Sequence, residues 1–205
     1  MQHHYSIDEN ILEVGLDECA RGCLFGSVIT AAVIWKRGDT NIISKKIKDS
    51  KKLSSKQHAE LYNYIIENCI DYAIDFGEVE EIDKYNISNT VFNSMHRCID
   101  KLKIKPNLLL VDGSYFRKYK MIEHINIPKG DNKFISIACA SIIAKHTHTE
   151  YIKQLCIDNP ELDEKYSLLS NKSYGTLKHI NGIKGFGITK YHRKYFGICK
   201  NYNKL

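Results

Sequence analysis

Four acidic side chains follow apolar runs of the sequence, at places where carboxylate chemistry could be combined. The runs at 11–17, 107–113 and 124–131 have the composition of buried strands, and each carries acids at its end: Asp17 with Glu18, Asp112, and Asp131. One acid at the end of one strand is most often part of a turn or a helix cap. If the three strands are neighbours, however, four carboxylates meet at one sheet edge and repel one another.

A divalent cation would remove that repulsion. Carboxylate oxygens with open positions suit Mg²⁺ or Mn²⁺, and the four acids include no His or Cys of the kind that zinc prefers. Two such ions about 3.5–4 Å apart can clamp the attacking water and the leaving oxygen of a phosphodiester. The acids therefore predict metal-dependent hydrolysis of a phosphodiester.

The elements that must position these acids form a mixed α/β pattern. Strands are expected at 11–17, 26–35 and 41–47 as an antiparallel meander, and further strands at 71–79, 107–113 and 124–131. Helices are expected at 55–69, with Ser54 or Ser55 as the cap, at 88–101 and at 134–156. This order predicts a mixed sheet flanked by helices, followed from Pro160 onward by a polar appendage of short helices and loops.

Bulk composition indicates what kind of partner the protein binds and in which compartment it works. The 205 residues suit one core domain with an appendage, and the net charge of +6 mildly favours an anionic partner such as nucleic acid. The seven cysteines are odd in number and lack the CxxC spacing of a zinc site, which favours a reducing, cytoplasmic compartment. We expect neither a signal peptide nor a membrane span, because the sequence shows no long apolar stretch.

Six motifs, in order and at matching spacing, resemble those of ribonuclease HII, the type 2 ribonuclease H family. They are VGLDECARGCLFGSV at 14–28, DSKKLS at 49–54, EEIDKYNISNTVFNSM at 80–95, LLVDG at 109–113, KGDNKFISIACASIIAK at 129–145, and NKSYGT with KYHRKYFG between 171 and 197. Each motif is weak alone, but the ordered set is specific.

The resemblance implies a ribonuclease H-like catalytic domain at 1–157 and a C-terminal helical substrate-binding region at 158–205. It implies that two Mg²⁺ or Mn²⁺ ions are held by Asp17, Glu18, Asp112 and Asp131. The enzyme would be a cytoplasmic monomer of DNA replication and ribonucleotide excision repair. It would cut the RNA strand of RNA/DNA hybrids, and duplex DNA on the 5′ side of a lone ribonucleotide, leaving 3′-hydroxyl and 5′-phosphate ends.

The resemblance also implies substrate-binding residues. The backbone of Ala20, Arg21 and Gly22 would read the 2′-hydroxyl, and Tyr174 would stack on the sugar of the next, deoxy residue. Ser50, Lys51 and Asn86 would lie against the nucleic-acid backbone.

The chain departs from the family pattern in four places. Ala20 stands where the family has glycine, so a turn that needs a positive φ would be strained. Cys23 replaces a proline, Ser173 replaces the glycine before Tyr174, and Thr147-His148-Thr149 replaces the family's T-R-D.

Simpler interpretations remain open beside this one. The chain could be a non-catalytic nucleic-acid-binding protein on the same fold, or a ribonuclease H that prefers hybrids and recognises junctions weakly. Locally, Tyr174 fits an ordinary half-buried tyrosine. His179 has no identifiable partner, and His192 with Arg193 would simply pack the tail against the core.

Overall fold

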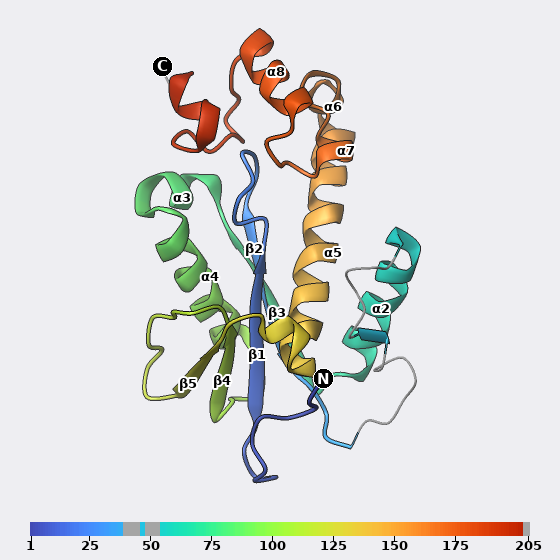
Figure 1. The fold of residues 1–205 in the computed structure, drawn as a ribbon, viewed down its shortest axis with the longest axis vertical. Helices are drawn as coiled ribbons and strands as arrows, with labels where there is room; N and C mark the ends of the chain where they lie inside the picture. The colour runs from blue at the N-terminus through green and yellow to red at the C-terminus, as the bar shows by residue number, and fades with distance from the viewer. Residues whose placement is uncertain (39–45, 48–53, 203–205) are drawn as a thin grey trace.

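The computed structural model describes residues 1–38, 46–47 and 54–202. Its centre is a five-stranded sheet in the order β3-β2-β1-β4-β5 (Figure 1). β1 (Glu13–Cys19) pairs antiparallel with β2 (Val28–Ile34), which pairs antiparallel with β3 (Asp71–Gly77). On its other side β1 is parallel to β4 (Leu108–Asp112), and β4 is parallel to β5 (Glu123–Ile127). The expected mixed sheet flanked by helices is confirmed.

The third antiparallel strand is not where the sequence pattern placed it. Most of the expected strand at 41–47 lies outside the described residues, and Lys46 and Ile47 are helical. The position beside β2 is taken by β3, which pairs with all seven residues of β2 from Val28 to Ile34. Each edge of a strand pairs with one neighbour, and β3 fills this edge of β2 along its whole length.

Helices cover both faces of the sheet. α3 (Val79–Tyr85) leads into α4 (Ile87–Lys101), which lies on one side of the strands, while α5 (Ile135–Asp158) and then α2 (Ser55–Asn68) lie on the other (Figure 1). The side chain of Ser54 caps α2 and exchanges a capping-box pair with Gln57, as its sequence position predicts. Apart from α3, these helices match the expected ranges to within a few residues.

α5 lies unusually close to β1. A Cβ placed on Gly15 would come within 2.2 Å of the backbone carbon of Ser136. The first turns of α5 are small or β-branched and fully buried, and this composition allows the close approach. The helix thereby becomes a rigid support for the strand that carries Asp17.

The C-terminal segment forms α6 (Glu161–Tyr166), α7 (Leu168–Asn171), α8 (Leu177–Phe186) and a final 3₁₀ helix, η3 (Gly197–Asn201). These elements sit beyond one end of the sheet, around the end of α5 (Figure 1). Their buried cluster includes Leu24, Phe25 and Ile152, so the segment shares its core with the loop after β1 and with α5. Through the described ranges, no helix combines the length and apolar character that a bilayer crossing requires.

Candidate active site

Asp17 and Asp112 stand at the same end of two neighbouring parallel strands. The parallel register pairs Leu16 of β1 with Val111 of β4, so the next residue of each strand is the acid. Side chains of laterally paired residues point to the same face of a sheet. Asp17 is buried, with 5% of its surface exposed, and Asp112 is half-buried. The fold therefore brings together two acids that are far apart in the sequence.

Burial and mutual repulsion disfavour the ionised form of these acids. Burial raises the pKa of Asp17 well above its usual value, the charges of Glu18 and Asp112 raise it further, and a hydrogen bond from Ser141 of α5 opposes the shift. Burial also raises the pKa of Glu18, against a hydrogen bond from Arg21, and the charge of Asp112 adds to the increase. Three carboxylates thus share one electrostatic environment, and a bound cation would relieve the cost of holding them ionised.

Asp131 reaches this end of the molecule by a different route from the one expected. β5 ends at Ile127, and Asp131 lies in a 3₁₀ turn, η2 (Gly130–Asn132), that follows Lys129 in a left-handed conformation with φ 57°. The strand expected at 124–131 is therefore wrong in its last residues, because this reversal ends the extended chain. The turn is tied to the site by the backbone N–H of Gly130, which donates to Asp112 at 2.7 Å.

The four acids do not form a closed set of ligands in this conformation. Within the part of the chain that the structure describes, no three His, Cys, Asp or Glu side chains are grouped closely enough to hold a metal ion. Asp131 accepts a hydrogen bond from the side chain of Asn132 at 2.8 Å, and Glu18 accepts one from Arg21 at 3.1 Å. Their shared coordination of metal stays a prediction.

A polar cavity of about 800 Å³ opens beside the acids. Its wall includes four residues that the sequence singled out, namely Glu18, Arg21, Asn86 and Asp112. The other walls come from the first turns of α4 and from residues 113–115 after β4. This is the part of the described surface where the carboxylates and the expected recognition turn face one space.

The turn at Ala20–Gly22 carries the strain that the missing glycine predicts. Ala20 has a φ of 68°, in the left-handed region, and its carbonyl accepts a hydrogen bond from the N–H of Cys23 at 3.2 Å. The guanidinium of Arg21 donates to Glu18 and to the hydroxyl of Ser88 at 3.0 Å. Asn86 also has a φ of 68° and caps α4, accepting from the N–H of Asn89. The Arg21 side chain thus links the end of β1 to the start of α4.

Tyr174 lies on the loop between α7 and α8, next to the same turn. It is 46% exposed, and Lys172 and Ser173 before it have φ values of 49° and 69°. Burial raises the pKa of the Tyr174 phenol to about 12, with a further contribution from the neighbouring thiol of Cys23. Of the remaining predicted contacts, Ser50 and Lys51 lie outside the described residues.

A second hollow of about 310 Å³ starts at Cys19 and runs past Tyr174. Its lining is mainly basic or imidazole and includes His58, Lys145, His148 and Lys172. Lys145 donates to Ser141 at 2.7 Å, so the hydroxyl that supports Asp17 also touches this basic lining. None of the four acids lines this hollow, but Cys19 in its wall directly follows Glu18 in β1.

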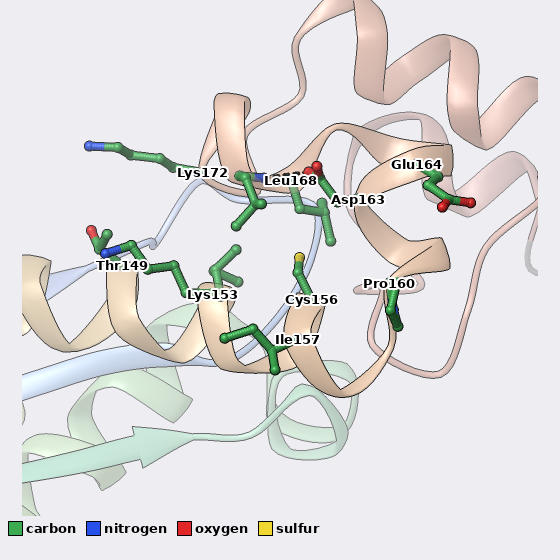
Figure 2. A pocket seen from close by; sticks show the side chains of 11 residues that line it. Thr149, Lys153, Cys156, Ile157, Pro160, Asp163, Glu164, Leu168 and Lys172 are labelled. Atoms are coloured by element: carbon green, nitrogen blue, oxygen red, sulfur yellow. Dashed lines mark hydrogen bonds between the residues drawn. The ribbon is translucent and has the colours of Figure 1, made fainter.

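A third, largely apolar hollow of about 560 Å³ lies between α5 and α6–α7 (Figure 2). Thr149, Lys153 and Lys172 stand at one end of it, and Pro160 and Glu164 at the other (Figure 2). None of the four acids lines it. Its chemistry does not suit phosphodiester hydrolysis.

The sequence reasoning missed two side chains that organise the site, and it found no partner for His179. Ser141 supports Asp17 and Ser88 holds Arg21. His179 has a partner after all, His192, at 3.2 Å between the two Nε2 atoms. These contacts join residues from separate elements, and no local spacing could have revealed them.

Comparison with known proteins agrees with this geometry. The family model described as ribonuclease HII matches residues 14–199. A ribonuclease HII of Bacteroides fragilis is 42% identical over 192 residues, which cover 94% of this chain and 92% of the relative. The crystal structure of ribonuclease H2 from Pyrococcus horikoshii superimposes with a TM-score of 0.77 at 20% identity, covering 94% of this chain and 97% of the other. The Bst-RNase HIII structure in complex with Mn²⁺ gives 0.70 at 20% identity, covering 94% and 69%.

Proposed function

Because this chain belongs to the ribonuclease HII family, whose members are ribonuclease H hydrolases, we propose that it cleaves two kinds of substrate. One is the RNA strand of an RNA/DNA hybrid, and the other is duplex DNA holding a single ribonucleotide, cut on the 5′ side of that residue. The products would carry 3′-hydroxyl and 5′-phosphate ends. The observation that carries this proposal is the coupled set of Asp17, Glu18 and Asp112 beside the 800 Å³ polar cavity.

We propose further that Asp17, Glu18, Asp112 and Asp131 hold two divalent cations, Mg²⁺ or Mn²⁺. The donors are carboxylate oxygens, which these ions prefer, and the raised pKa of Asp17 and Glu18 reflects the cost of keeping buried carboxylates ionised. Bound ions would act as Lewis acids on the phosphate and would generate the attacking hydroxide at neutral pH. The structurally similar Bst-RNase HIII forms a complex with Mn²⁺, which supports this metal class.

The protein's own groups then bind and orient the substrate. The Ala20–Gly22 turn lies directly after the acids, so a 2′-hydroxyl read by its backbone would sit beside the phosphate to be cut. Tyr174 of the C-terminal segment lies beside this turn, where the N–H of Leu24 donates to the carbonyl of Ser173, and its half-exposed ring would stack on a sugar. Asn86 lines the cavity and would contact the nucleic-acid backbone. Ser50 and Lys51 lie outside the described residues, and their proposed contact with that backbone rests on the family's DSKKLS motif.

In this proposal residues 1–157 are the catalytic domain and residues 158–205 the substrate-binding region. The basic hollow formed by Lys145, Lys172 and their neighbours would carry phosphates of the duplex past the site. We further propose a monomer that acts in the cytoplasm in ribonucleotide removal and DNA replication. The seven free thiols are in keeping with a reducing compartment.

The decisive test is cleavage of a duplex with one ribonucleotide in the presence of Mg²⁺ or Mn²⁺. We expect a single nick 5′ of that residue, and EDTA should stop turnover while leaving most of the affinity for the duplex. Asp112→Asn should abolish cleavage without loss of binding. Asp158→Asn, at an exposed acid at the end of α5 that accepts from Gln154, is the matched control and should cut normally. An Asp112→Asn enzyme with an unchanged rate would refute the site.

A second candidate function differs in substrate preference rather than in chemistry. The left-handed Ala20 costs the turn free energy that a glycine would not, which favours a ribonuclease H with weak junction recognition that acts mainly on hybrids. Comparing the rates on a lone-ribonucleotide duplex and on a long hybrid separates the two. The non-catalytic alternative fits less well, because a protein that only binds should not keep clustered acids facing phosphates.

A further inference from the structure

A pair of buried histidines stands behind the loop that carries Tyr174. His179 on α8 and His192 are both 0% exposed, and their Nε2 atoms lie 3.2 Å apart. Aromatic rings surround them: Tyr166 lies 4.7 Å and Phe25 lies 5.0 Å from His192, between ring centroids. Neither histidine touches the four acids, so the reaction itself does not require the pair.

The hydrogen-bond partners assign the proton positions on both rings. His179 Nδ1 lies 3.0 Å from the carbonyl oxygen of Tyr174, which can only accept, so this nitrogen carries a proton. His192 Nδ1 accepts from the backbone N–H of Thr189 at 3.0 Å, so that nitrogen carries none. With both rings neutral, His192 must donate through Nε2 to the Nε2 of His179. The result is a directed chain from Thr189 through the two rings to Tyr174.

The chain holds no place for an extra proton. A proton added to His179 Nε2 or to His192 Nδ1 would set two donors face to face. This agrees with burial lowering the pKa of His192 to about 3 and lowering that of His179. The pair is therefore a fixed structural relay at neutral pH rather than a proton donor.

Arg193, the residue after His192, connects the C-terminal segment to the Ala20–Gly22 turn. Its Nη1 donates to the carbonyl oxygen of Arg21 at 3.0 Å and its Nε donates to that of Gly26 at 2.9 Å. Arg193 is 0% exposed, while Gly22 is exposed. In a planar trans peptide the carbonyl and the N–H point in opposite directions. Fixing the Arg21 carbonyl inward therefore fixes the N–H of Gly22 outward.

We propose that His179, His192 and Arg193 are positioning residues that join Tyr174 and the Ala20–Gly22 turn into one rigid unit for recognising a ribonucleotide next to a deoxynucleotide. The two elements are about 150 positions apart in the sequence, and two adjacent residues, His192 and Arg193, hold them together. A backbone hydrogen bond from the N–H of Leu24 to the carbonyl of Ser173, at 3.0 Å, joins them as well. The proposal rests on the proposed substrate. It predicts that weakening the relay affects junction recognition more than cleavage within a hybrid.

The test compares two substitutions of one residue. His179→Leu removes both hydrogen bonds, whereas His179→Asn keeps an amide N–H near the position of Nδ1 and so keeps the bond to the Tyr174 carbonyl. Both leave His192 Nε2–H without its acceptor, so the general loss of stability is matched. We expect His179→Leu to lower the ratio of kcat/KM on the lone-ribonucleotide duplex to kcat/KM on the hybrid by about fivefold to tenfold, the value of one hydrogen bond. His179→Asn should keep the wild-type ratio within about twofold.

A wild-type ratio in the leucine variant would overturn the proposal, because a purely structural residue would affect both substrates alike. An asparagine variant whose ratio falls as far as that of the leucine variant would also overturn it, because the bond to the Tyr174 carbonyl would then have no effect on recognition. If the leucine variant does not fold, nitrogen NMR of the wild-type imidazoles at pH 7 decides. Protons on Nδ1 of His179 and on Nε2 of His192 are expected, and the reverse tautomers would refute the relay. A wild-type enzyme that cuts hybrids but never the lone-ribonucleotide duplex would instead remove the proposed junction activity, while the tautomers would still report on the relay.

Discussion

Replacing Gly15 by alanine tests whether the close packing of α5 on β1 supports the candidate active site. The added Cβ would meet three backbone atoms of α5, the carbon and oxygen of Ser136 at 2.2 and 2.5 Å and the nitrogen of Ile137 at 2.3 Å. Carbon atoms in contact prefer separations of about 3.5–4.0 Å, so α5 and β1 must separate by more than about 1 Å. None of these atoms can rotate away, because they belong to the backbone of a buried helix.

The expected cost follows from that displacement. Overpacking a core typically costs about 1–3 kcal/mol, and a clash with backbone belongs at the upper end of this range. For a chain of this size each kcal/mol lowers Tm by about 2–4 °C, so we expect a fall of about 6–12 °C. Activity should fall as well, because Ser141, which donates to Asp17, lies on the same helix.

Thermal and urea unfolding of Gly15→Ala measure the effect. The matched control is Gly185→Ala in α8, where a Cβ meets nothing within 4 Å. That helical glycine should gain about 0.5–1 kcal/mol on substitution. If Gly15→Ala unfolds within about 0.5 kcal/mol of the wild type, α5 does not rest on β1 as the structure has it, and the reasoning is wrong.

Three further predictions address charge, protonation and strain. Asp17→Asn should raise the stability of the metal-free protein, because it removes a buried charge beside two others. The variant should also lose any Mg²⁺-dependent rise in Tm, and a larger Mg²⁺ effect on its Tm would contradict the metal site. Burial lowers the pKa of His148 to about 4 and that of His192 to about 3. The unfolded chain therefore binds these protons first, and the two histidines should lower stability as pH drops below about 6.5, by up to about 1.4 kcal/mol per pH unit for each. The raised pKa of Asp17 acts in the opposite direction, so the effect is measured in the Asp17→Asn variant. Urea midpoints between pH 8 and pH 5 check this, and a level curve would count against it. Ala20→Gly should change stability little, because relief of about 1 kcal/mol of left-handed strain is offset by loss of a buried methyl worth about 0.8 kcal/mol. It should nevertheless speed cleavage of the lone-ribonucleotide duplex relative to the hybrid, and an unchanged ratio would show that the turn already reads the junction.

Much of the architecture could be predicted because its signals are local. Apolar runs mark β1, β2 and β4, the Ser54–Gln57 capping box marks the start of α2, and the small residues of α5 predict a helix that packs closely on the sheet. The strained conformation of Ala20 could also be anticipated, since an alanine stands in a turn where glycine is expected. In each case the residues that determine the feature lie within a few positions of one another.

The errors in the prediction concern pairing and chain reversal. The expected strand at 41–47 lies mostly outside the described residues, and the edge of β2 where the meander would have continued is paired along its whole length with β3. Asp131 was expected at a strand end, but the left-handed Lys129 and the turn after it place the acid beyond β5. Neither choice is encoded in hydrophobic periodicity, because the same short apolar run can end as a strand or continue into a turn.

The sequence alone determined which side chains are available for chemistry: carboxylates of the kind that hard cations prefer, an arginine turn directly after two of them, and the ordered motifs of its family. Tertiary structure alone decided which groups meet. It placed Asp112 beside Asp17, His192 behind His179, and Arg193 against a carbonyl 172 positions away. The physical reason is that side-chain identity is a local property, whereas the cost of burying a charge or a donor is settled by whichever partner the packed fold brings within reach.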